Sequence, residues 1–122
     1  MTRDRSTPPE LAVSLRRALA QCRHLTAQGR DAFLDPGLDA QIRRLAGERL
    51  VITVQAVLDD LPEGFTEEHA DLPFATVRGM RNRLAHGYDD IDATIVWRTL
   101  DVRLPHFLDE VISRLEAVPP RP

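Results

Sequence analysis

The sequence predicts an all-α fold, a bundle of four or five helices that run up and down. Apolar residues recur at helical spacing in every long segment. Clusters of glycine, proline and aspartate separate these segments. The one run with strand-like composition, Leu50 to Val54, has neighbours on both sides that keep the helical period, so we expect helix there too. Helices joined by short turns pack as a bundle.

Start and stop signals mark the first two helices. Thr7, Pro8 and Glu10 form an N-cap, a first-turn proline and a capping-box acid, and Gly29 ends the helix. Its apolar face consists of Leu11, Leu15, Ala18, Leu19, Cys22 and Leu25. A connector through Asp35-Pro36-Gly37 precedes the second helix, which ends at the turn residues 61–64. The apolar stripe on one face of that helix consists of Leu38, Ile42, Leu45, Ile52 and Ala56.

The third helix and a last long helical segment complete the bundle. We expect the third helix to begin at Leu72 or Pro73 and Gly87 to supply its C-terminal cap. The last segment begins near Asp92, and Pro105 should kink it or split it into two pieces. Its apolar positions are Ile95, Trp97, Leu100, Leu104, Phe107, Leu108, Val111 and Leu115. Trp97 is most simply a core residue.

Length and composition predict a single soluble domain. With 122 residues the chain forms one domain, 1–122, whose core spans about residues 8–117 and whose ends, 1–6 and 118–122, are frayed. Cys22 is the only cysteine, so a disulfide framework and a cysteine-rich zinc site are excluded, and a reducing cytoplasm is the natural compartment. The apolar runs are short and the first residues lack an apolar signal core, so we expect neither export nor membrane insertion.

The charge balance limits how this chain can contact nucleic acid. Sixteen basic residues against nineteen acidic ones give a formal net charge of −3, which is not typical of a protein that coats nucleic acid. Any contact with RNA must therefore be local. All sixteen cations are arginines, and arginine is the better bidentate ligand for phosphate.

One arginine of the third helix lies where an apolar residue is expected. At about 100° per residue, Arg81 falls in the middle of the apolar stripe that Phe74, Val77 and Leu84 form. A guanidinium in that position must either form an ion pair with an acidic side chain or take part in binding or catalysis. Glu48, which borders the apolar stripe of the second helix, is the expected ion-pair partner, although Arg49 competes for the same carboxylate.

The neighbouring residues form a small, polar ridge. Asn82 and His86 are four residues apart and lie one above the other, and Ala75 and Gly79 continue the ridge toward the start of the helix. Tyr88 follows two residues after His86. Small residues permit close approach of another helix, so this ridge is a candidate interface.

These residues resemble a known family, the HepT-like HEPN proteins, which are toxins of two-gene toxin-antitoxin modules. The resemblance covers roughly residues 8 to 117, in order along the chain. An isolated Arg-x4-His pair would be weak, because it occurs by chance in many chains. The matching segments are Gly47-Glu48, Leu72-Pro73-Phe74, Met80-Arg81-Asn82, His86-Gly87-Tyr88, Ile91-Asp92, Val96-Trp97 and Leu104-Pro105.

The resemblance implies a metal-independent endoribonuclease that needs no cofactor, with Arg81, Asn82 and His86 as its motif residues. It also implies that Tyr88 is a modification site. In some members a cognate minimal nucleotidyltransferase antitoxin attaches AMP to this tyrosine and silences the toxin. Phe74 stands where relatives often carry tryptophan, which concerns packing and not the chemistry.

The same residues suit RNA cleavage on chemical grounds. A ribose 2′-hydroxyl that loses its proton can attack the neighbouring phosphate without a metal, and His86 is the motif side chain that titrates near neutral pH. Arg81 and Asn82 can donate to the charge that develops on phosphorus. One copy supplies only one histidine for acid and base. We therefore expect a composite site at the two-fold interface of a homodimer.

Simpler interpretations remain open for several residues. His86 can cap the last carbonyl groups of its helix. Arg78 and Arg83 either extend a phosphate-binding surface or form an ordinary solvated face. A noncatalytic HEPN module that binds a nucleotide or a protein is the alternative function.

The remaining histidines and acids are expected to be structural. His24, His69 and His106 have no metal-ligand spacing, so we expect no metal site. The acids Asp89, Asp90 and Asp92 are expected to cap the following helix.

Overall fold

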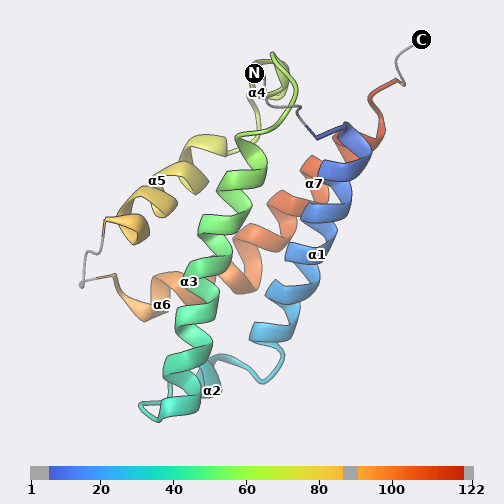
Figure 1. Ribbon diagram of the computed structural model, residues 1–122. Coiled ribbons are helices and arrows are strands. Elements are labelled where there is room, and N and C mark those ends of the chain that lie inside the picture. The colour runs from blue at the N-terminus through green and yellow to red at the C-terminus, as the bar shows by residue number, and fades with distance from the viewer. Residues whose placement is uncertain (1–5, 87–90, 120–122) are drawn as a thin grey trace.

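The computed structural model describes residues 6–86 and 91–119, and every regular element in these ranges is helical. The long elements are α1 (Pro8–Thr26), α3 (Leu38–Leu58), α5 (Phe74–Ala85) and a continuous run of α6 (Ala93–Arg98), η1 (Thr99–Arg103) and α7 (Leu104–Glu116). The short helices α2 (Arg30–Leu34) and α4 (Phe65–Glu68) lie in the connections. Consecutive long elements run in opposite directions (Figure 1). The prediction of an all-α fold is confirmed.

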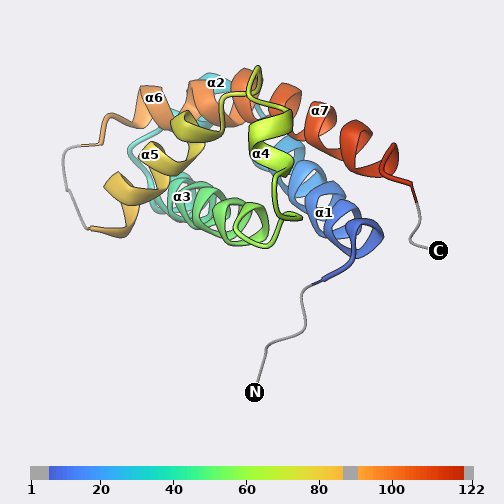
Figure 2. The ribbon, with the colours of Figure 1, turned by 90° about the horizontal axis from the view of Figure 1, so that it is seen from above.

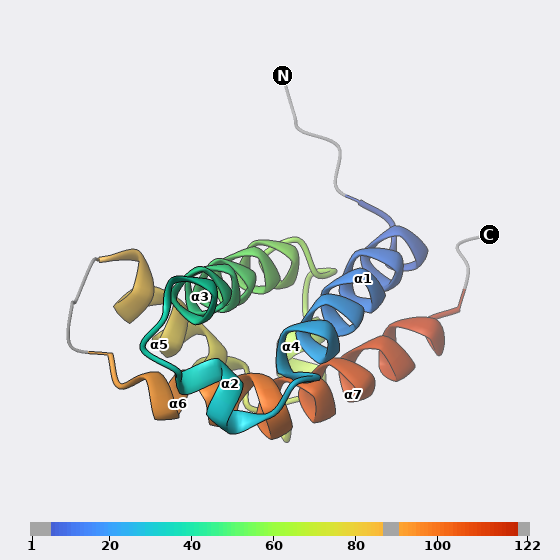
Figure 3. The same ribbon diagram turned by 90° about the horizontal axis from the view of Figure 1, so that it is seen from below.

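The helices enclose one core. Viewed from above, α6 and α7 lie along one side of the molecule, α3 and α1 lie along the other, and α5 closes one end between them (Figure 2). α1 packs mainly on α7 and α3, and α5 packs on α3. α2 crosses the lower end of the bundle (Figure 3), where Phe33 contacts Trp97 with ring centroids 5.4 Å apart. Trp97 is therefore the core residue that the sequence predicts.

α1 forms as its capping residues predict. The Thr7 hydroxyl oxygen accepts the Glu10 backbone N–H at 3.3 Å, and the same hydroxyl donates to the Glu10 carboxylate at 3.0 Å. The predicted apolar face is buried, apart from the half-buried Leu25. The helix ends at Thr26, and Gly29 instead starts α2 with a φ of 92°, a value that favours glycine.

α3 is apolar on two opposite faces, and the core covers the face opposite the predicted stripe. The apolar stripe predicted from the sequence is largely exposed, with Leu38 at 76 %, Ile42 at 64 % and Leu45 at 59 %. The buried residues of α3 are Ala40, Gly47, Leu50, Val51, Val54, Gln55 and Leu58. This face combines the apolar residues Leu50, Val54 and Leu58 with Gly47, where the Leu100 side chain comes so close that a Cβ atom would clash. Apolar as α3 is, no described helix has the length and hydropathy needed to span a membrane.

The irregularity predicted at Pro105 is a π-helical turn just before the proline, and the helical run stays continuous across it. Proline lacks a backbone N–H and cannot complete the α-helical pattern, and just before it the Leu104 N–H bonds to the Thr99 carbonyl. The Cys22 thiol donates to the carbonyl of Leu100 at 2.8 Å, inside this turn. Burial raises the pKa of Cys22 to about 12. Cys22, a member of the predicted apolar face, is thus buried, and its thiol joins α1 to the irregular turn.

Candidate functional site

α5 is anchored at its first turn and open toward its last. Within α5, which the structure describes in full, the buried residues are Phe74 and Val77. The Phe74 ring meets Phe107 of α7 edge-on at 5.3 Å and Phe65 at 6.4 Å. Leu84, in the last turn, is only half-buried. The aromatic contacts therefore fix the start of α5, while its C-terminal half extends along the surface.

Asn82 contacts both of the other motif residues, Arg81 and His86. Its side-chain oxygen accepts a hydrogen bond from Arg81 Nη1 at 3.0 Å. Its backbone carbonyl lies 2.6 Å from His86 Nδ1 and also accepts the His86 backbone N–H at 3.2 Å. Asn82 and His86 are exposed and Arg81 is half-buried. A guanidinium, an amide and an imidazole therefore lie together on an open surface at the end of one helix.

The contact to Asn82 determines which nitrogen of His86 can take up a proton. A carbonyl oxygen only accepts hydrogen bonds, so Nδ1 carries the proton in this contact. In the neutral ring Nε2 then holds the lone pair, and it is the nitrogen that can accept a proton from a hydroxyl group. The capping role and the chemical role that the sequence leaves open for His86 are thus compatible, because capping uses one nitrogen and orients the other.

The expected ion pair between Arg81 and Glu48 does not form. Arg81 bonds to Asn82, and no ion pair of Glu48, with Arg81 or with Arg49, occurs among the described residues. The prediction placed Arg81 inside the apolar stripe of its helix. That stripe is buried only at Phe74 and Val77, so the guanidinium at the open end reaches the surface and needs no buried carboxylate.

α5 is a basic helix in an acidic chain. It carries Arg78, Arg81 and Arg83 and contains no Asp or Glu. Arg78 and Arg83 are exposed, and none of the three forms an ion pair in the described part of the chain. The C-terminal end of a helix is partly negative and repels anions. These arginines supply the positive charge that a phosphate group would need there.

Two predicted features lie wholly or partly outside the described residues. Gly87, the expected helix cap, and Tyr88, the expected modification site, both fall there, as do Asp89 and Asp90. The third acid of that cluster caps α6 as predicted, because the Asp92 carboxylate accepts the Thr94 backbone N–H at 2.9 Å. Among the described residues, no group of three or more His, Cys, Asp or Glu side chains could hold a metal ion.

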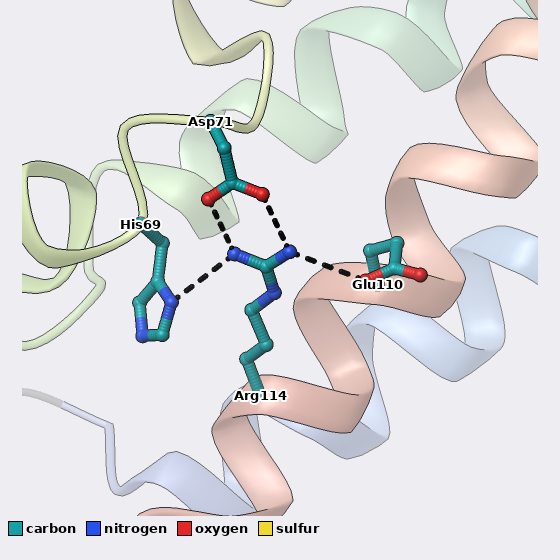
Figure 4. A network of polar contacts seen from close by, with 4 residues as sticks. All are labelled: His69, Asp71, Glu110 and Arg114. Carbon is teal, nitrogen blue, oxygen red and sulfur yellow. Dashed lines mark hydrogen bonds and ion pairs between the residues drawn. The ribbon is translucent and has the colours of Figure 1, made fainter.

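A polar network between α4 and α7 could not be seen in the sequence. Arg114 donates two hydrogen bonds of 2.7 Å to Asp71, one of 3.4 Å to Glu110, and one of 3.3 Å to Nδ1 of His69 (Figure 4). The bonds from Arg114 lower the pKa of Asp71, and those to Asp71 raise the pKa of Arg114. Only the spacing of Glu110 and Arg114 along one helix pointed to any part of this network.

A family model described as "HepT-like: Ribonuclease HepT-like" matches residues 15–114, a range that begins within α1, ends within α7 and includes all three motif residues. The chain belongs to the HepT-like ribonuclease family. The resemblance inferred from the motif is thereby confirmed at the level of the family.

Curated relatives carry names consistent with this family. The chain is 30 % identical over 103 residues to "Putative RNase TTE0752" of Caldanaerobacter subterraneus subsp. tengcongensis. The aligned region covers 84 % of this chain and 91 % of the relative. The chain is also 27 % identical over 71 residues to "Putative RNase MJ0125" of Methanocaldococcus jannaschii, covering 56 % of this chain and 61 % of the relative. No solved structure matches the chain.

Proposed function

We propose that this HepT-like protein is a metal-independent endoribonuclease whose site is built from Arg81, Asn82 and His86. The observation that carries the proposal is the junction at Asn82, which holds a permanent cation and an oriented imidazole on one exposed surface. Nε2 of His86 takes the proton from the ribose 2′-hydroxyl, and the oxygen attacks the adjacent phosphorus. Arg81 and the Asn82 amide group donate to the phosphorane oxygens. Arg78 and Arg83 extend the surface that contacts RNA.

The products of cleavage test this mechanism. Attack by the 2′-hydroxyl leaves a 2′,3′-cyclic phosphate on one fragment and a 5′-hydroxyl on the other. We expect the purified protein to yield these ends from single-stranded RNA in the presence of EDTA. Activity that disappears with EDTA and returns with magnesium would contradict the mechanism. A failure to cleave any RNA, combined with nucleotide or protein binding at the same residues, would favour the noncatalytic HEPN module.

We further propose that the site is composite and forms across a homodimer. One copy supplies a single motif histidine, whereas cleavage needs an acid as well as a base. A second copy can dock on the exposed part of the apolar stripe on α3, where Leu38, Ile42 and Leu45 follow at steps of four and three and can pair with their own symmetry mates. α3 and the last turn of α5 lie on the same side of the molecule, away from α6 and α7 (Figure 2). A partner on α3 would therefore lie beside the motif residues.

A charge in the stripe tests this arrangement. Leu45→Glu should abolish the dimer in sedimentation experiments and lower cleavage together with it, because each monomer keeps only half of the site. Val13→Glu is the matched control, since Val13 is 58 % exposed on α1 and Leu45 is 59 % exposed on α3. A Leu45→Glu protein that still sediments as a dimer would place the interface elsewhere.

We also propose that the protein is the toxin of a toxin-antitoxin pair and that its antitoxin is a minimal nucleotidyltransferase that attaches AMP to Tyr88. The position of Tyr88, two residues after His86, supports this. An added phosphodiester would compete for the cations that bind the substrate phosphate. Co-expression with such a transferase should increase the intact mass by one or more AMP units, and Tyr88→Phe should prevent this increase. If co-expression of the transferase protects cells from the Tyr88→Phe protein as fully as from the wild type, the partner inhibits by masking the site and not by modifying it.

A further inference from the structure

A cavity of about 700 Å³ lies between α5 and the η1–α7 segment and reaches Val51 of α3. The side chains from α5 that line it are Thr76, Val77 and Met80, and none of the motif residues does so. At about 100° per residue, Thr76 and Met80 face away from the ridge of Asn82 and His86. Its volume is in the range of small-ligand sites, which is roughly 300–1,000 Å³. The mechanism proposed above does not use this cavity.

The π-helical turn shapes one wall of the cavity. Thr99, Val102 and Arg103 of η1 all line it, and Val102 is 60 % exposed. π-helical turns inside α-helices occur frequently at functional sites. The inner side of this turn is held in place, because Leu100 is fully buried and its carbonyl accepts the Cys22 thiol. The wall is therefore irregular and firmly supported.

The charges of the cavity are unequal at its two ends. At one end Asp71 and Glu110 are both bonded to Arg114, whose guanidinium offsets one of their two negative charges. Arg103 and His106 line the other end, are exposed, and have no hydrogen-bond or ion-pair partner among the described residues. His106 precedes Arg114 by about 12 Å along the helix axis. The cavity thus offers an apolar floor that includes Met80, Leu104 and Phe107, with the guanidinium of Arg103 and the imidazole of His106 beside it.

This end of the cavity is connected to the motif along α5. Thr76, Met80 and Arg83 follow one another on a single ridge of the helix, and Arg83 neighbours His86 three residues later. Met80 and His86 are about 9 Å apart along the helix axis. An RNA strand with its reacting phosphate at His86 would pass over Arg83 and reach the mouth of the cavity.

We propose that this cavity is a subsite for a nucleotide beside the cleaved bond. Its unpaired base enters between α5 and η1–α7, and its phosphate contacts Arg103 and His106. The proposal rests on the proposed ribonuclease function, and it identifies single-stranded RNA as the substrate class. An apolar protein segment would also fill the cavity, but it would bring no anion to the exposed guanidinium of Arg103.

Two substitutions on the exposed wall test the subsite without disturbing the core. Val102→Trp should block the mouth, and Arg103→Glu should repel the phosphate. We expect each to weaken the affinity for a short 2′-O-methyl RNA, which lacks the attacking hydroxyl, by about tenfold or more, the effect of losing one stacked base. With cleavable RNA, the change should appear mainly in KM. The matched controls are Val13→Trp, because Val13 is 58 % exposed, and Arg17→Glu, because Arg17 is an exposed arginine on α1.

Photo-crosslinking separates the subsite from the catalytic proposal. RNA that carries 4-thiouridine should crosslink to peptides containing Met80 or Val102 in the His86→Ala protein, whether or not the wild type cleaves. If the wild type cleaves RNA but both substitutions leave RNA affinity unchanged, the subsite is overturned and the ribonuclease function stands. If the crosslinks form but the wild type never cleaves, the subsite stands and the catalytic function fails. Loss of a protein partner at unchanged RNA affinity would assign the cavity to that partner and overturn the proposal.

Discussion

α5 and α7 have nearly the same length, 12 and 13 residues, yet they contribute to the molecule in opposite ways. α7 buries six residues and pairs its Arg114 with two carboxylates, whereas α5 buries two residues and leaves its three arginines without ion pairs in the described structure. The buried residues of α7 are Leu104, Phe107, Leu108, Val111, Ile112 and Leu115. α7 thus contributes more buried residues to the core than α5, and the candidate chemistry lies on the less buried of the two helices.

The largest effect should come from His86, at the open end of α5. His86→Ala should lower the rate of RNA cleavage by about 10²–10⁴-fold, the usual contribution of a general acid or base. The melting temperature should barely change, because His86 is exposed. The control is His24→Ala, which removes another exposed histidine from α1 and should leave cleavage intact. A large loss of stability in the His86→Ala protein would weaken the contrast between the two helices.

A core substitution in α7 should have the opposite effect to His86→Ala, because it should lower the stability of the fold. Leu108 is fully buried, so Leu108→Ala should lower the free energy of unfolding by about 3 kcal/mol, measured with urea. Arg83→Ala on α5 should change it by less than about 0.5 kcal/mol, because the residue is exposed and lacks an ion pair in the described structure. Similar losses for the two proteins would show that α5 contributes more to the fold than its burial indicates.

Two glycines sharpen the same contrast. A Cβ atom at Gly47 of α3 would lie 2.5 Å from the Leu100 side chain, which is fully buried, so Gly47→Ala should cost about 1–3 kcal/mol of stability. A Cβ atom at Gly79 of α5 would meet nothing within 4 Å, so Gly79→Ala should stabilise the chain by about 0.5–1 kcal/mol. Urea unfolding measures both changes. If Gly79→Ala destabilises a dimeric sample, the ridge of α5 lies in the interface.

The smallest effect concerns pH. Because Arg114 lowers the pKa of Asp71 in the folded chain, this carboxylate stabilises the fold above its ordinary pKa of 3.8, and the contribution is lost as the pH falls through the lowered value. Asp71→Asn should therefore be slightly less stable than the wild type at pH 7 and equally stable in strong acid. Thermal unfolding across this range measures the difference. Arg83→Gln on α5 should show no such dependence.

Local signals in the sequence predicted most of the helices and their caps. Thr7 and Asp92 cap helices as expected, because the partners of a capping side chain lie within a few residues along the chain. The orientation of α3 was not predictable from apolar spacing, since the helix has two apolar faces and the buried one includes Ala40 and Gly47. The sequence proposes the candidate site residues and the capping contact of His86, but not the hydrogen bond between Arg81 and Asn82. The Arg81 guanidinium needs a carboxylate partner only if neighbouring helices bury this part of α5. The spacing of residues within one helix does not reveal that burial.

The packing of α1 against α7 has a consequence for the synthesis of this protein. The first and last long helices of the chain lie side by side (Figure 1), and α7 covers much of the apolar face of α1. A growing chain that has already exposed α5 still lacks the helix that closes its core, so this domain cannot complete its fold until α7 has left the ribosome. Any activity carried by α5 therefore begins only after α7 has emerged and packed on α1. A cell that makes this protein meets it first as an unfolded chain, which chaperones and proteases can still intercept.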